Sequence, residues 1–108
     1  MEDRRRMPRV PFVAICELLE VNTGIRLNAQ VSELSLHGCY VDTVNPLGKD
    51  TEVYVKVFSD EYFFESPARV VYCHASLGMG LEFHDVKPHF LTVLQNWLIA
   101  PAKKESRN

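Results

Sequence analysis

The stretch Ile25-Arg26-Leu27-Asn28-Ala29-Gln30-Val31-Ser32 alternates between apolar and polar side chains without a break. Successive side chains of a β-strand point to opposite faces of its sheet, so this period of two predicts a half-buried strand over residues 25–32. The polar set faces water. The predicted inward set is Ile25, Leu27, Ala29 and Val31.

Similar short segments lie on both sides of this strand. The turn residues Asn22-Thr23-Gly24 separate it from Phe12–Glu20, whose even-numbered positions are apolar from Phe12 to Leu18. Further segments follow at 39–43, 52–58, 62–74 and 79–83, divided by stretches rich in proline, glycine and polar residues. Pro67 interrupts the segment 62–74, and this predicts a bulge or an edge at that point.

The period of the apolar residues changes from two to that of a helix near the C-terminal end. Pro88 suits the first turn of this helix, and Pro101 is expected just beyond its end. Six or so short strands with hairpin-length links predict an antiparallel barrel or sandwich, with the helix packed across an open end or side. The apolar stripe of the helix is Phe90, Val93, Leu94, Trp97 and Leu98.

The composition narrows the classes of function. A chain of 108 residues with 46% hydrophobic and 24% charged residues fits one globular domain. Its net charge of −2 argues against coating nucleic acid or an anionic membrane. No apolar run reaches the roughly 20 residues that span a bilayer, and no secretory signal is recognisable. The three widely spaced cysteines, Cys16, Cys39 and Cys73, resemble small buried hydrophobes in a reducing compartment, so we expect a cytoplasmic protein.

Catalytic and metal-binding patterns are absent from the sequence. Ser35, His37 and Asp42 include the residue types of a catalytic triad, but no nucleophile elbow surrounds the serine. The histidines and cysteines have no metal-ligand spacing, and Cys73 and His74, adjacent in a strand, point to opposite faces. We therefore expect a binding module that is not an enzyme and has no metal and no cofactor.

Two features point to a binding site for an anion. The first is the cluster Arg4-Arg5-Arg6-Met7-Pro8-Arg9, which alone is typical of a solvated basic arm, although Pro8 favours an extended backbone. Arginine matches phosphate and the acceptor edge of guanine with two parallel hydrogen bonds. The second is Glu33-Leu34-Ser35-Leu36-His37-Gly38, which alone indicates a polar break between strands.

Taken together, these features resemble the motifs of the PilZ domain, a family of bacterial receptors for the second messenger cyclic di-GMP. The first of these motifs is RxxxR, here Arg5 and Arg9, just before the first strand. The second is an acidic residue followed by x-Ser-x-x-Gly, here Glu33, Ser35 and Gly38, after the second strand. The likeness covers the chain from Arg4 to about Ile99. It implies a six-stranded antiparallel β-barrel with a C-terminal amphipathic helix, and cyclic di-GMP as the ligand.

The resemblance also implies roles for individual residues. Arg5 and Arg9 would bind the phosphates and guanine edges of the ligand, and Ser35 would hydrogen-bond to it. Gly38 would allow close approach of the backbone. Arg4 could stack on a guanine or favour an intercalated ligand dimer.

Glu33 departs from the family pattern, which has Asp or Asn at this position. Its carboxylate can still accept hydrogen bonds from the N–H groups of guanine. The side chain is longer by one methylene, about 1.5 Å of bond length, which would weaken or shift the contact with the base.

The predicted organisation is a flexible arm carrying RxxxR (1–10), the barrel domain with its closing helix (11–100) and a disordered tail (101–108). The ligand would order the arm against the barrel, and a downstream protein partner would recognise the changed surface. One alternative is a degenerate PilZ domain that serves only as a protein-interaction module. Another is a binder of single-stranded nucleic acid that uses Tyr40, Tyr54 and Tyr62 for stacking.

Overall fold

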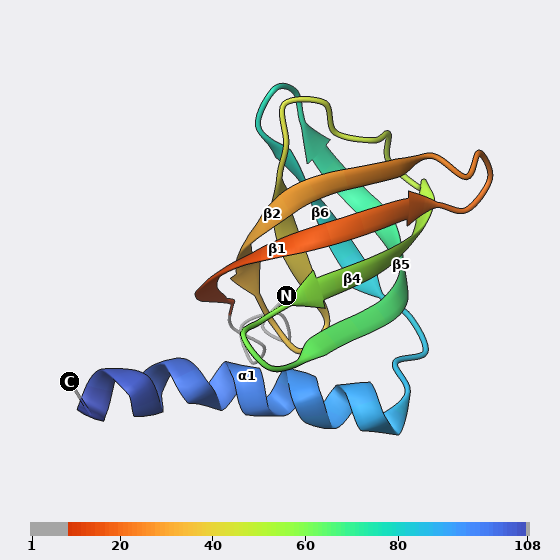
Figure 1. The fold of residues 1–108 in the computed structure, drawn as a ribbon. Helices are drawn as coiled ribbons and strands as arrows, with labels where there is room; N and C mark the ends of the chain where they lie inside the picture. The colour runs from red at the N-terminus through yellow and green to blue at the C-terminus, as the bar shows by residue number, and fades with distance from the viewer. Residues whose placement is uncertain (1–8, 108) are drawn as a thin grey trace, which may run out of the picture.

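The computed structural model describes residues 9–107, which form six strands and one helix (Figure 1). All pairings are antiparallel, and the sheet closes on itself in the order β1-β2-β3-β6-β5-β4. The predicted six-stranded barrel with a C-terminal helix is therefore confirmed. The elements are β1 (Val10–Glu20), β2 (Arg26–Leu34), β3 (Gly38–Asp42), β4 (Glu52–Phe58), β5 (Phe63–His74), β6 (Gly78–Phe83) and α1 (Pro88–Arg107).

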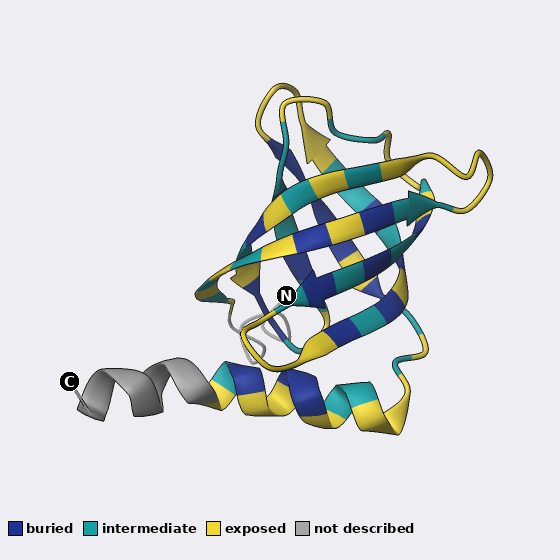
Figure 2. Ribbon diagram, viewed as in Figure 1, coloured by how far each residue is buried: buried dark blue, intermediate teal, exposed yellow. Residues whose placement is uncertain are grey.

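The alternation of the strands produces a core inside the barrel. Figure 2 shows buried and less buried residues following one another along the strands, as expected when one face of each strand lines the interior. The inward valines of β4 at 53, 55 and 57 are almost completely buried, and Phe64 and Phe83 pack with ring centroids 4.8 Å apart. Ile25 was predicted to point inward, but it precedes β2 and is 51% exposed, because the strand begins only at Arg26.

Helix α1 crosses one end of the barrel and buries its apolar stripe there (Figure 1). Val93, Leu94 and Trp97 are buried, and the Trp97 ring stacks on Phe12 of β1 with centroids 5.1 Å apart. The stripe and the start at Pro88 are confirmed. The predicted end before Pro101 is wrong: a proline removes one helical hydrogen bond, but the following Ala102–Glu105 are good helix formers, and α1 continues to Arg107.

Two irregularities in the strand pairing lie at other positions than the sequence predicts. Strand β2 extends through Glu33, so the predicted polar break at 33–38 is shorter than expected. A register shift between Val31 and Glu33 interrupts the alternation, so the regular pattern of the sequence stops at Ser32 although the strand continues. The bulge or edge predicted at Pro67 is also wrong, because Pro67 keeps its register with β4 and the shift falls between Val70 and Tyr72.

The three cysteines are free thiols in different environments. Cys16 and Cys39 are buried as predicted, and burial raises the pKa of the Cys16 thiol to about 12. Cys73 is exposed near the end of β5, contrary to the expectation of a buried residue. Within residues 9–107, no helix combines the length and hydropathy needed to cross a membrane.

Candidate functional site

Strand pairing brings the two sequence motifs to one corner of the barrel. Arg9 immediately precedes β1, and β1 pairs with the end of β2 through Pro11 opposite Glu33. The start of β1 and the end of β2 lie side by side in Figure 1. The short turn after Leu34 then leads into β3 at Gly38. Residues 24 positions apart in the sequence, Arg9 and Glu33, therefore become neighbours.

The guanidinium of Arg9 is held between an acid and an aromatic ring. Its Nη1 lies 3.3 Å from Oε1 of Glu33, and both side chains are 48% exposed. Its Cζ lies 5.8 Å from the centroid of the Tyr72 ring, within the range of a cation–π interaction. Partial burial lowers the pKa of Arg9, but hydrogen bonding and charge interactions with Tyr72 and Glu33 outweigh it and raise the pKa overall. Arg9 is thus a permanent cation in a preformed position.

Ser35 organises the turn between β2 and β3. Its backbone N–H donates to the carbonyl oxygen of Gly38 at 2.9 Å, and its Oγ accepts from the N–H groups of His37 and Gly38 at 3.2 Å each. The hydroxyl itself is 3.3 Å from the Gly38 carbonyl oxygen, and the residue is only 7% exposed. These bonds occupy the hydroxyl, so a ligand contact at Ser35 would require it to exchange a partner.

Gly38 is needed for the barrel itself. It pairs with Glu82 of β6, and a Cβ at Gly38 would overlap the backbone carbonyl oxygen of Leu81. Gly38 thus allows a close approach of strand β6. The contact holds β3 against β6 and so fixes the position of the neighbouring turn. The predicted approach of a ligand to the Gly38 backbone stays a prediction.

Tyr72, which lies beside Arg9, and its neighbour Tyr40 were not predicted as a group. Tyr72 and Tyr40 lie on the outer surface with ring centroids 6.2 Å apart, and the Tyr40 hydroxyl is 3.0 Å from Nδ1 of His74. Their rings cover Gly78 and Gly80 of β6, where any Cβ would overlap them. The alternating Gly-Met-Gly of β6 was the available signal, since two glycines on one face of a strand leave room for large side chains on its neighbours.

The other residues considered from the sequence do not gather into a site. Tyr54 donates to Glu65 at 3.0 Å, and Tyr62 lies on the β4–β5 loop, so neither joins Tyr40 in a stacking surface. Among the described residues, no group of three or more His, Cys, Asp or Glu side chains could hold a metal ion. Arg4 and Arg5 lie outside the described residues.

Comparisons with known proteins agree on one family. A family model described as PilZ domain matches residues 3–100. The PilZ domain of YcgR from Escherichia coli with c-di-GMP aligns with a TM-score of 0.76 and 19% identity, covering 96% of this chain and 95% of that chain. The PilZ domain of CeSA from a cellulose-synthesizing bacterium aligns with a TM-score of 0.69 and 20% identity, covering 88% of this chain and 98% of that chain.

The Bacillus subtilis inhibitor of motility (MotI/DgrA) aligns with a TM-score of 0.76 and 16% identity, covering 94% of this chain and 52% of that chain. The comparison with curated proteins gave no match. At these identities the solved structures establish a shared fold.

Proposed function

The chain belongs to the PilZ domain family, and from this membership we propose that it is a receptor for cyclic di-GMP that passes a signal to a partner protein. The observation that supports this most is the convergence of Arg9, Glu33 and the Ser35 turn at one corner of the barrel. These groups offer a fixed cation, a carboxylate acceptor and a rigid turn to one ligand. We place this function in the cytoplasm, where free thiols such as the exposed Cys73 remain reduced.

In the proposed complex, the arginines supply most of the affinity. Arg9 and Arg5 would donate paired hydrogen bonds to the phosphates or to the acceptor edge of guanine. Glu33 would accept from the guanine N–H groups, and Ser35 would exchange one of its turn contacts for a ligand contact. Arg4 would stack on a base or favour an intercalated ligand dimer.

The proposed signal is a change of surface at the start of β1. Contacts between the ligand and the arginines would fix the segment that precedes Arg9 against the barrel wall, and the partner protein would bind the resulting surface. This adaptor role needs no chemical step, so the proposal is a binding module and not an enzyme. The parts of it that concern Arg4 and Arg5 lie outside the described residues.

Isothermal titration calorimetry with cyclic di-GMP tests the proposal. Arg9→Ala should weaken binding roughly thirtyfold or more, since removing one partner of a desolvated charge contact costs about 2–5 kcal/mol. It should hardly change the melting temperature, because the Arg9–Glu33 pair is half exposed and worth at most about 1 kcal/mol. Arg26→Ala is the matched control, since Arg26 is an exposed arginine at the opposite end of the β1–β2 pair.

One observation favours a second candidate, a degenerate PilZ module that binds only proteins. Glu33 neutralises Arg9 in the structure, as a ligand phosphate would. No heat of binding and no thermal shift at millimolar cyclic di-GMP would reject the receptor function and support this candidate.

A further inference from the structure

A broad groove lies between the start of β1, the β4–β5 loop and α1. Its volume is about 1050 Å³, and Trp97 and Phe12 are among the residues that line it. Strand β1 contributes two outward-facing apolar side chains, Val13 and Ile15, which are 72% and 66% exposed. Apolar side chains this exposed, and adjacent on one strand face, are typical of interaction surfaces.

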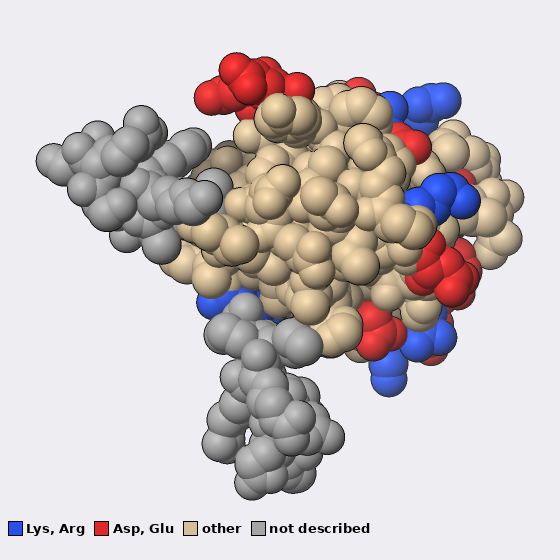
Figure 3. All heavy atoms as spheres, turned by 90° about the horizontal axis from the view of Figure 1, so that it is seen from below, with Lys and Arg blue, Asp and Glu red and all other residues tan. Residues whose placement is uncertain are grey.

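The neighbouring face of α1 is free of charge. The sequence has no Asp, Glu, Lys or Arg from Pro88 to Ala102, and the exposed Thr92 and Asn96 line the groove. Figure 3, which looks at this side of the molecule, shows a wide face without acidic or basic side chains in its centre. A surface helix of a globular protein ordinarily carries charges on its outer side, whereas the centres of protein interfaces are depleted of them.

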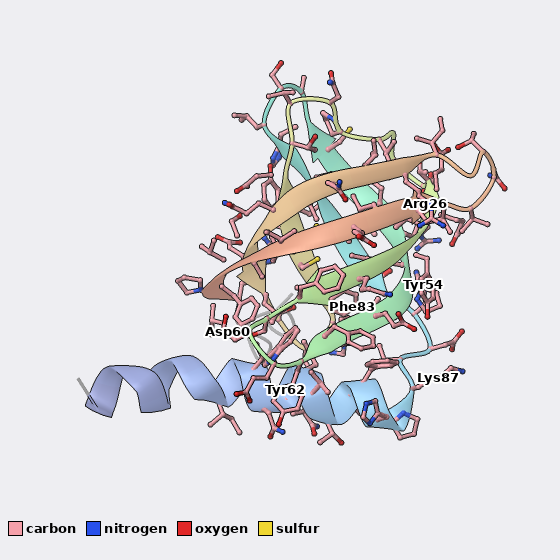
Figure 4. All side chains as sticks on the ribbon, in the orientation of Figure 1. Arg26, Tyr54, Asp60, Tyr62, Phe83 and Lys87 are labelled. Atoms are coloured by element: carbon pink, nitrogen blue, oxygen red, sulfur yellow. The ribbon has the colours of Figure 1, made fainter. Side chains whose placement is uncertain are left out.

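The Asp, Glu, Lys and Arg side chains at the edge of the groove carry a single sign of charge, and His89 is the one histidine in its described lining. Asp60 and Glu61 on the β4–β5 loop are exposed and line it, and no described Lys or Arg does so. Figure 4 places Asp60 and Tyr62 on this loop beside α1. An occupant that matches the groove therefore has an apolar surface bordered by basic side chains.

We propose that this groove docks an amphipathic helix of a partner protein, with its apolar face on Val13 and Ile15 and its Lys or Arg side chains opposite Asp60 and Glu61. A strand is a poorer fit, because β1 is paired on both sides, with β2 and β4, and offers no free edge for strand addition. A second copy is also a poorer fit, because two α1 faces in contact would bring no Lys or Arg between 88 and 99 to the acidic loop, only His89. This docking does not require the proposed ligand, because the groove is open in the structure without it.

The probe is a synthetic helix of about 18 residues with Leu on one face and Lys on the other, long enough to form a stable helix. Its control has Glu in place of every Lys. Trp97 is the single tryptophan and lines the groove, so its fluorescence and indole NMR signal report binding of Trp-free peptides. The Lys peptide should bind saturably, and the Glu peptide at least tenfold more weakly. The double variant Asp60→Lys with Glu61→Lys should reverse this order.

A matched pair of variants locates the contact. Val13→Thr with Ile15→Thr keeps β-branched side chains and should weaken the Lys peptide at least fivefold. The control is Val44→Thr with Leu77→Thr, at loop positions that are 70% and 67% exposed and outside the groove, and it should leave the affinity unchanged. Equal effects of the two pairs, or no saturable binding at millimolar peptide, would overturn the proposal. Self-association that the Val13 and Ile15 substitutions suppress would also overturn it, in favour of a second copy.

Discussion

Arg9 cannot bind a ligand phosphate fully while it remains paired with Glu33. The two side chains are 3.3 Å apart in the structure, so the proposed complex must weaken this pair or share it with the ligand. A half-exposed ion pair of this kind is worth at most about 1 kcal/mol, which would cost up to roughly fivefold in affinity. In the proposed complex Glu33 would therefore tune the affinity for the ligand, in addition to any contact with a guanine.

The first prediction concerns the length of this side chain. Glu33→Asp should tighten cyclic di-GMP binding by about three- to tenfold, because the shorter carboxylate holds Arg9 less well and loses less rotamer entropy at the base. Calorimetry on the purified variant measures the change. Weaker binding by Glu33→Asp would show that the pocket is built around the longer carboxylate.

Glu33→Gln separates the two causes, since it keeps the length and removes the charge. If release of Arg9 dominates, Glu33→Gln also tightens binding. If the carboxylate contact with guanine dominates, Glu33→Gln weakens binding while Glu33→Asp strengthens it.

The environment of single residues was the hardest part to predict from the sequence. The neighbours of Arg9 depend on pairing between strands that are distant in the chain, so the Glu33 ion pair and the Tyr72 ring could not be deduced from spacing. Gly38 was expected to make room for a ligand, but in this structure it makes room for the Leu81 carbonyl oxygen of β6. Only the register of the strands reveals such contacts.

At the scale of elements, aromatic side chains of β1 and β5 hold α1 on the barrel, Phe12 against Trp97 and Phe64 against Phe90. Trp97 is 6% exposed and stacks on Phe12. Trp97→Ala should lower the free energy of unfolding by about 3–5 kcal/mol, measured by chemical denaturation, because it leaves a cavity under the helix. Asn96→Ala, at the exposed neighbouring position, should change it by less than about 0.5 kcal/mol.

The same experiment extends to a double-mutant cycle with Phe12→Ala. A coupling of about 0.5–1.5 kcal/mol between the two substitutions is expected for stacked rings. Additive effects would show that the ring contact contributes nothing beyond burial.

The elements themselves were largely predictable, because each depends on a local period. Alternation located all six strands, and the 3.6-residue period located the stripe of α1. The errors lie where another influence overrides the period: the register shifts after Val31 and after Val70, and the helix propensity beyond Pro101. Closure of the barrel follows from the pairing of β1 with β4, for which the sequence holds no local signal.

At the scale of the whole molecule, the start of β1 is shared by the candidate ligand site and the groove. Arg9 lies in the first and Pro11 lines the second, while Pro11 also pairs with Glu33. Phe12 then connects this segment to Trp97 on α1. A ligand that repositions Arg9 must act on a strand segment that forms one wall of the groove.

If both proposals hold, the two sites are linked, and linkage is reciprocal. Saturating cyclic di-GMP should change the affinity of the Lys peptide by about fivefold or more, and saturating peptide should change the affinity for cyclic di-GMP by the same factor. Titration of each ligand in the presence and absence of the other measures both factors.

Arg9→Ala should abolish the effect of cyclic di-GMP while leaving the peptide affinity of the ligand-free protein unchanged, since Arg9 does not line the groove. Unequal factors would show that one of the titrations did not report an equilibrium affinity, and affinities that are the same with and without the other ligand would show that β1 does not transmit the change. Because the groove is open to the peptide without the ligand, either result leaves the docking experiment itself intact.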